Sequence, residues 1–173
     1  MCPDTKALLA YVKSELFFAA ICYYIKINPK PITAMAKKIA EQLIDTLVES
    51  GVERIYAVTG DSLNEVNEAV RKNNKIQWIH VRHEETGAYA AAAEAQLTGR
   101  IGCCAGSSGP GHVHLINGLY DAQRSGAPVI AIASTIPSGD FGPDNFQETQ
   151  HIKLFNDCSY YTDVATTPGK FPR

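Results

Sequence analysis

Two adjacent carboxylates, Glu84 and Glu85, are the first candidates for chemistry in this sequence. They lie in the stretch VRHEETGAYAAAAEAQLTGR, which spans residues 81–100. Acidic side chains also favour the first turn of a helix because of the helix dipole, so the pair alone does not establish a catalytic role. The alanines that follow are strong helix formers, and their small side chains would let another element approach closely.

A glycine-rich turn, GSSGPG at residues 106–111, is a second candidate. Its glycines lack the spacing of a dinucleotide-binding fingerprint, and no Lys-Ser/Thr pair follows as in a P-loop. A tight strand-to-helix turn is the simpler interpretation. His112 and His114 are two residues apart and would not share a helix face, so no metal site is predicted. The segment DNFQET, at residues 144–149, indicates no particular chemistry by itself.

The surrounding sequence alternates between strand-like and helix-like segments. Short apolar or β-rich runs predict strands at 54–58, 75–81, 100–106, 128–134 and 160–165. Apolar periodicity predicts helices at 39–50, from 62 onward, and at 84–97, 112–124 and 151–158. This alternation is typical of a three-layer α/β/α fold with a mainly parallel sheet covered on both faces.

Two local signals mark helix ends. Ser62 and Glu65 have the spacing of a capping box, with Ser62 as the N-cap. Gly51 would end the helix before it as a C′ glycine. In an open parallel sheet, ligands bind at the carboxyl ends of the strands. The residues expected there are Thr59–Asp61, Glu84, Gly106–Gly111 and the loop 135–149.

Composition limits the class of protein. The chain has 173 residues and a formal net charge of −2, without a basic stripe, which argues against nucleic-acid binding. Its five cysteines show no metal-binding spacing and predict reduced thiols in a cytoplasmic protein. Residues 1–34 differ from the rest and only weakly match a signal peptide. We expect a poorly structured leader upstream of a true start at Met35, and one domain over residues 35–173.

Several motifs carry more information together than separately. In this order and spacing, VTGDS, VRHEETGAYAAAAEAQLTGR, GSSGPG, INGLYDA, APVIAI and FQET resemble the N-terminal pyrimidine-binding (PYR) domain of thiamine-diphosphate-dependent enzymes. The resemblance runs from about Met35 to Arg173 and is greatest to pyruvate oxidase and quinone-dependent pyruvate dehydrogenase. RHE, GPG and FQE are shared with acetolactate synthase, the alternative, whereas TGDS and the doubled HEE favour the pyruvate-oxidising enzymes.

This resemblance implies roles for individual residues. Glu84 would bind N1′ of the aminopyrimidine of thiamine diphosphate, and the cofactor then serves as an electron sink in decarboxylation of pyruvate. Glu85 would be structural or face a subunit interface. The other implied contacts are Val58, Thr59 and Gly60 near the pyrimidine, Gly109, Pro110 and Gly111 in the tight turn, and Phe146 and Gln147 facing the reacting end.

The resemblance also implies further domains and partners. In the family, Mg²⁺ holds the diphosphate through a G-D-G motif that this sequence lacks, and a separate domain binds FAD. The family's active sites lie between a PYR domain and the diphosphate-binding domain of another subunit in a homo-oligomer. We expect the PYR domain to be incomplete after TTPGKFPR, and the chain to be inactive alone. Three interpretations stay open: a fragment of a longer enzyme, a split subunit, or a binding module without catalysis.

Overall fold

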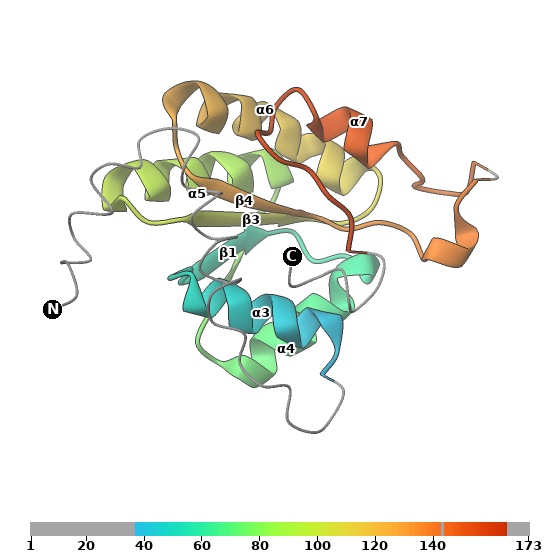
Figure 1. The fold of residues 1–173 in the computed structure, drawn as a ribbon, viewed down its shortest axis with the longest axis horizontal. Coiled ribbons are helices and arrows are strands. Elements are labelled where there is room, and N and C mark those ends of the chain that lie inside the picture. The colour runs from blue at the N-terminus through green and yellow to red at the C-terminus, as the bar shows by residue number, and fades with distance from the viewer. Residues whose placement is uncertain (1–36, 143, 166–173) are drawn as a thin grey trace, which may run out of the picture.

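The computed structural model describes residues 37–142 and 144–165. Helices cover both faces of one parallel sheet (Figure 1), which confirms the predicted three-layer α/β/α fold. The predictions for residues 1–34 and for TTPGKFPR at 166–173 lie outside the described residues. Four strands lie side by side in the order β2 (Gln77–His80), β1 (Arg54–Ala57), β3 (Gly102–Gly106) and β4 (Val129–Ala133).

The helices divide between the two faces of the sheet (Figure 1). One face carries α3 (Ile39–Glu49) and α4 (Asn64–Asn73). The opposite face carries α5 (Glu84–Thr98), α6 (Pro110–Ser125) and the short α7 (His151–Phe155). Two short 3₁₀ helices, η1 (Asp61–Leu63) and η2 (Ser138–Asp140), lie in connections. None of the described helices is long and apolar enough to cross a membrane.

Strand β3 is buried along its whole length because both faces of the central sheet are covered. Successive side chains of a strand point to opposite faces. Cys103 therefore packs with Ile44 and Ile55 beneath α3, whereas Cys104 packs with Ala88 and Leu115 beneath α5 and α6. Burial raises the pKa of the Cys104 thiol to about 12 and that of Cys103 well above its ordinary value. The adjacent cysteines are thus two inert core residues, one in each apolar layer.

Small residues allow α5 to lie against both α6 and β3. A Cβ atom at Gly118 of α6 would lie 2.5 Å from the Cβ of Ala88. A Cβ atom at Gly102 of β3 would lie 2.1 Å from the carbonyl oxygen of Ala91. Neither contact leaves room for a side chain. The alanine-rich stretch therefore does more than favour a helix, because it sets how closely three elements approach.

The predicted capping box is wrong. Helix α4 begins at Asn64, one turn of 3₁₀ helix precedes it, and no side chain caps either start. The Ser62 hydroxyl instead lies 2.6 Å from the Ser134 hydroxyl and 2.9 Å from the Ser107 hydroxyl. Tertiary hydrogen bonds have replaced the local one. The predicted C′ role of Gly51 is consistent with its φ of 85°, the left-handed region that glycine tolerates.

The predicted strand at residues 160–165 is also absent from the described structure, where these residues form no strand. Tyr160 and Tyr161 are mostly exposed, so the apolar members of the pattern do not face a core. The Asp163 carboxylate accepts a hydrogen bond from the backbone N–H of Val164 at 2.7 Å. Such local bonds compete with strand pairing.

Candidate functional site at the carboxyl ends of the strands

The carboxyl ends of β1 and β3 form the point where the strand order reverses. From β1 the chain moves outward to β2, then crosses to β3 and moves outward to β4. A crevice opens at such a switch point in parallel sheets. Val58, Thr59 and Gly60 directly follow β1, and the GSSGPG turn ends β3 and leads into α6. The two segments touch, since a Cβ atom at Gly60 would lie 2.3 Å from the Ser107 hydroxyl.

Glu84 is the first residue of α5, and its side chain is turned into the protein. Only 8% of the residue is exposed. Its Oε2 atom lies 3.0 Å from Nδ1 of His114. A carboxylate only accepts hydrogen bonds, so Nδ1 carries the hydrogen in this pair. The other oxygen, Oε1, lies 3.3 Å from the position of a Cβ atom at Gly111, so a larger residue there would crowd the carboxylate.

Glu85, the next residue, has a different environment. Its side chain is 36% exposed, and its Oε1 accepts a hydrogen bond from the Asn117 amide at 3.3 Å. Its Oε2 lies 3.8 Å from Nδ1 of His83. The two neighbouring acids therefore differ in burial and partners. One faces the switch point, and the other links the start of α5 to α6.

The GSSGPG segment is a tight strand-to-helix turn, as its sequence indicated. Gly109 has a φ of 66° and ψ of −121°, a conformation that residues with side chains rarely adopt. Pro110 is the first residue of α6, two residues earlier than predicted for this helix, and its ring suits that position. The loop after β4 docks on this turn. A Cβ atom at Gly109 would lie 2.9 Å from the Cα atom of Gln147.

The loop residues Phe146 and Gln147 lie differently from one another. Gln147 accepts a hydrogen bond from the Ser108 hydroxyl at 3.0 Å and has a φ of 64°. Phe146 is 87% exposed. The structure thus brings Gln147 onto the glycine turn, whereas the side chain of the neighbouring Phe146 lies mostly in solvent. Thr59 is likewise exposed beside the turn.

A cluster of serine hydroxyl groups joins the segments at this edge of the sheet. The Ser62 hydroxyl contacts those of Ser107 and Ser134, and it also accepts the backbone N–H of Ser108 at 2.9 Å. Ser134 Oγ donates to the carbonyl of Gly106 at 3.1 Å. Sequence analysis missed this cluster because its members come from η1, the β3–α6 turn and the end of β4. Nothing local distinguishes them from other turn serines.

His112, which sequence analysis considered only as a metal ligand, has a different role in the structure. It is 1% exposed, and burial lowers its pKa. Nδ1 donates to the carbonyl of Ser134 at 2.8 Å, so Nε2 accepts from the Thr149 hydroxyl at 2.6 Å. The imidazole therefore ties the end of β4 to the end of the following loop. His114 points elsewhere, as expected for two residues that do not share a helix face.

Comparison with known proteins agrees with this geometry. Residues 37–154 match the family described as thiamine pyrophosphate enzyme, N-terminal TPP binding domain. The chain belongs to this family. Thiamine pyrophosphate is the thiamine diphosphate named above, so the resemblance inferred from the motifs is confirmed.

Three curated relatives illustrate the range of this family. The chain is 50% identical over 140 residues to a putative thiamine pyrophosphate-containing protein, YdaP, of Bacillus subtilis, matching 80% of this chain and 24% of that one. It is 40% identical to the pyruvate oxidase of Lactiplantibacillus plantarum, over 75% of this chain and 22% of the oxidase. It is 31% identical to acetolactate synthase 3 of Brassica napus, over 79% of this chain and 21% of the synthase. The chain thus spans about a quarter or less of each relative.

The site of this TPP-binding domain suits the edge of a flat, nitrogen-containing ring. Glu84 places a buried carboxylate close to the backbone of Gly111, where any side chain would crowd it. The segments that follow β1 and β3 bring their backbones to the same edge of the sheet, at the carboxyl ends of the strands. The described residues hold no lysine or arginine at the GSSGPG turn that could bind a diphosphate. A buried carboxylate beside turn backbone is compatible with the ring end of the cofactor.

Proposed function

We propose that this chain binds the aminopyrimidine ring of thiamine diphosphate and activates the cofactor through Glu84. The observation that carries the proposal is the buried Glu84 carboxylate, whose Oε1 lies beside Gly111 at the switch point of the sheet. Glu84 would share a proton with N1′ of the ring. When bound, the cofactor supplies a nucleophilic thiazolium carbon and an electron sink for decarboxylation of a 2-oxo acid.

The surrounding residues would position that proton. His114 donates to Oε2 and so leaves Oε1 as the oxygen available to the ring. Gly109, Pro110 and Gly111 would let the backbone lie against the ring, and Val58, Thr59 and Gly60 would form its other side. We place Gln147 and Phe146 nearer the reacting end, on the loop held by Ser108. Packed alanines of α5 exclude water behind the carboxylate.

We further propose a pyruvate oxidase type of reaction, the oxidative decarboxylation of pyruvate. The support is the 40% identity to a pyruvate oxidase, compared with 31% to an acetolactate synthase. Acetolactate synthesis is the second candidate, because the same part of the chain matches both enzymes. We propose that the chain works in a homo-oligomer, where a diphosphate-binding domain of another subunit holds the diphosphate through Mg²⁺. FAD would bind to a separate flavin domain. A cytoplasmic location is inferred from the free thiols at Cys103, Cys104 and Cys158.

The role of Glu84 can be tested with the chain itself. The probe is 4-amino-5-hydroxymethyl-2-methylpyrimidine, the ring end of the cofactor, titrated while backbone amide NMR shifts are recorded. We expect shifts at Gly60, Gly109 and Gly111 that disappear in Glu84→Gln. Glu85→Gln is the matched control and should keep them. Equal shifts in both variants, or shifts confined to other parts of the chain, would refute the assignment.

The reaction type needs a second experiment. Residues 37–154 would replace the matched segment of the Lactiplantibacillus plantarum pyruvate oxidase in one chimaera and of the Brassica napus acetolactate synthase in another. We expect pyruvate-dependent turnover only from the first, with folding of both checked by circular dichroism. Turnover only from the second would favour the acetolactate alternative.

A further inference from the structure

His83, Glu84 and His114 form a cluster of metal-binding side chains beside the candidate site. One potential ligand atom from each lies within 4.8 Å of the other two. The two imidazole rings are stacked, with centroids 4.4 Å apart and planes 25° apart. Sequence analysis considered only His112 with His114 and predicted no metal site from that pair. The fold instead brings His114, from the second turn of α6, to His83, which precedes α5.

The ligand types suit a particular class of metal ion. Two imidazoles and one carboxylate are a common set for a three-ligand zinc site with an open fourth position. Mg²⁺ and Ca²⁺ prefer oxygen ligands, so imidazole nitrogens select against them. This separates the cluster from the ion that the family uses at the diphosphate.

Access and rigidity also favour binding here. The side chains of His83 and His114 are 47% and 42% exposed, so an ion can enter and keep water as a further ligand. The Glu84 side chain is 11% exposed and is already oriented by His114. Glu85 Oε2 lies 3.8 Å from Nδ1 of His83 and adds negative charge, which offsets the positive end of the α5 dipole.

We propose that His83, Glu84 and His114 bind a late divalent transition-metal ion, represented by Zn²⁺, and that this ion competes with the cofactor ring for Glu84. The competition rests on the proposed function, whereas the metal site does not. A divalent ion held at either oxygen of Glu84 withdraws negative charge from the whole carboxylate, which then accepts the proton shared with a ring nitrogen far less well. Zn²⁺ would therefore block cofactor loading from the ring end, and removing the ion with a chelator would restore it.

The metal site is tested first, by titrating Zn²⁺ into the tag-free chain in a calorimeter. Loss of a second-shell partner typically weakens a metal site by 10- to 100-fold, so loss of a ligand should cost at least about that. We expect His83→Asn and His114→Asn each to show this loss. His80→Asn and His151→Asn are matched controls and should bind like the parent. Equal binding by all four variants, with circular dichroism unchanged, would overturn the site.

Cobalt identifies the ligands independently. Co²⁺ bound by nitrogen and oxygen lacks the thiolate charge-transfer bands that any site built from the chain's cysteines would show. We expect ligand-field bands without a thiolate band, and their loss in His114→Asn. A thiolate band that persists in the histidine variants would assign the metal to cysteines and overturn the proposal.

Competition is tested last, with the aminopyrimidine probe and saturating Zn²⁺. We expect Zn²⁺ to weaken probe binding at least tenfold in the parent chain and to have no effect in His83→Asn. Zn²⁺ bound through the histidines without any effect on the probe would overturn the competition. That result would count against the proposed role of Glu84 and leave the metal site standing, so the two failures are distinguishable.

Discussion

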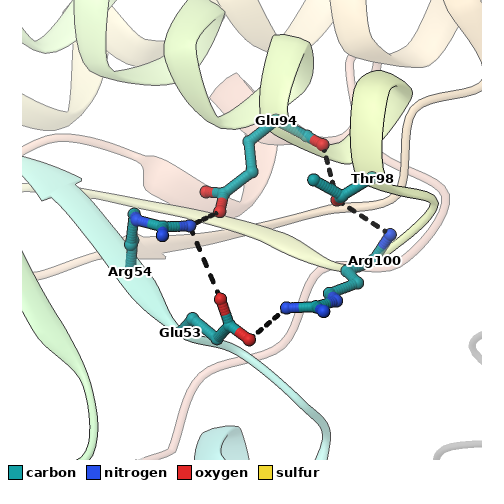
Figure 2. A network of polar contacts seen from close by, with 5 residues as sticks. All are labelled: Glu53, Arg54, Glu94, Thr98 and Arg100. Carbon is teal, nitrogen blue, oxygen red and sulfur yellow. Dashed lines mark hydrogen bonds and ion pairs between the residues drawn. The ribbon is translucent and has the colours of Figure 1, made fainter.

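The two ends of the sheet are held together by different kinds of polar contact. At the carboxyl end, Glu84, Ser62 and His112 are buried or half-buried, and each makes a short hydrogen bond to another segment of the chain. At the amino end, Figure 2 shows Arg54 bridging Glu53 and Glu94, and Glu53 also pairing with Arg100. The side chains of Glu53 and Arg100 are 50% and 57% exposed.

This difference determines what each end can do. Exposed ion pairs contribute little to stability and are screened by salt, so the amino end tolerates change. Buried polar groups are costly to leave unpaired, so the hydrogen bonds of Glu84 Oε2, Ser62 and His112 hold the carboxyl end in one arrangement. A region built in this way can hold a carboxylate in one orientation, which acid–base chemistry requires. Glu94 is more buried than the other charged groups of the amino end, since its side chain is only 14% exposed. Burial, together with the charge of Glu94, raises the pKa of Tyr56.

The largest effect is expected at His112. Changing His112 to Ala removes a buried ring and leaves the Ser134 carbonyl and the Thr149 hydroxyl unpaired, at a cost of about 2 to 4 kcal/mol in the free energy of unfolding. Urea denaturation followed by circular dichroism measures this. His80→Ala, at an exposed position, should cost far less. Equal losses of unfolding free energy in the two variants would show that the hydrogen bonds of His112 do not add to stability.

Cys104, in the middle of β3, belongs to neither polar network and shows the effect of burial alone. Its pKa is about 12 in the folded protein against an ordinary 9.0, so unfolding releases a proton above pH 9. Because the folded pKa is raised, the stability it contributes is complete below pH 9 and is lost as pH rises. By pH 10.5 the loss reaches about 2 kcal/mol. Cys104→Ala should flatten the fall in unfolding free energy between pH 8.5 and 10.5, and parallel curves would contradict this.

A smaller effect is expected at Ser62. Ser62→Ala removes the acceptor of the Ser108 N–H and the partner of two hydroxyl groups, at a cost of about 1 to 2 kcal/mol. Ser125→Ala is the matched control, since Ser125 bonds in an exposed setting with Gln96. Thermal denaturation of both variants tests the prediction. An equal shift in melting temperature would remove the distinction between hydroxyl groups at the site and elsewhere.

The smallest effect is expected at the amino end. Arg54→Met breaks the pairs with Glu53 and Glu94 but keeps most of the aliphatic side chain (Figure 2). We expect a destabilisation smaller than that of Ser62→Ala, and smaller still in 1 M salt because of screening. Denaturation of the variant at low and high salt measures both. A large, salt-independent loss would mean that this network resembles the carboxyl end after all.

Much of the fold followed from local sequence patterns. The short apolar or β-rich runs at 54–58, 100–106 and 128–134 became β1, β3 and β4, because short runs of this kind between turns are typical of strands in a covered parallel sheet. Periodicity found α3 and α5 to within one or two residues. The errors came where a pattern had a tertiary competitor. Ser62 does not cap a helix, because its hydroxyl bonds with those of Ser107 and Ser134. Tyr160 and Tyr161 form no strand, because their side chains are mostly exposed and do not pack on a core.

By itself, the sequence determined the layers of the fold, the family, and the acid placed at the start of α5, because hydrophobic spacing and ordered motifs are local properties of the chain. Only the tertiary structure decided how the two acids differ. It buried Glu84 beside Gly111 and left Glu85 half-exposed against Asn117. It also paired His114 with His83 and brought two distant serine hydroxyls, those of Ser107 and Ser134, to the Ser62 hydroxyl. Those contacts depend on which strands lie side by side, and no single segment encodes that order.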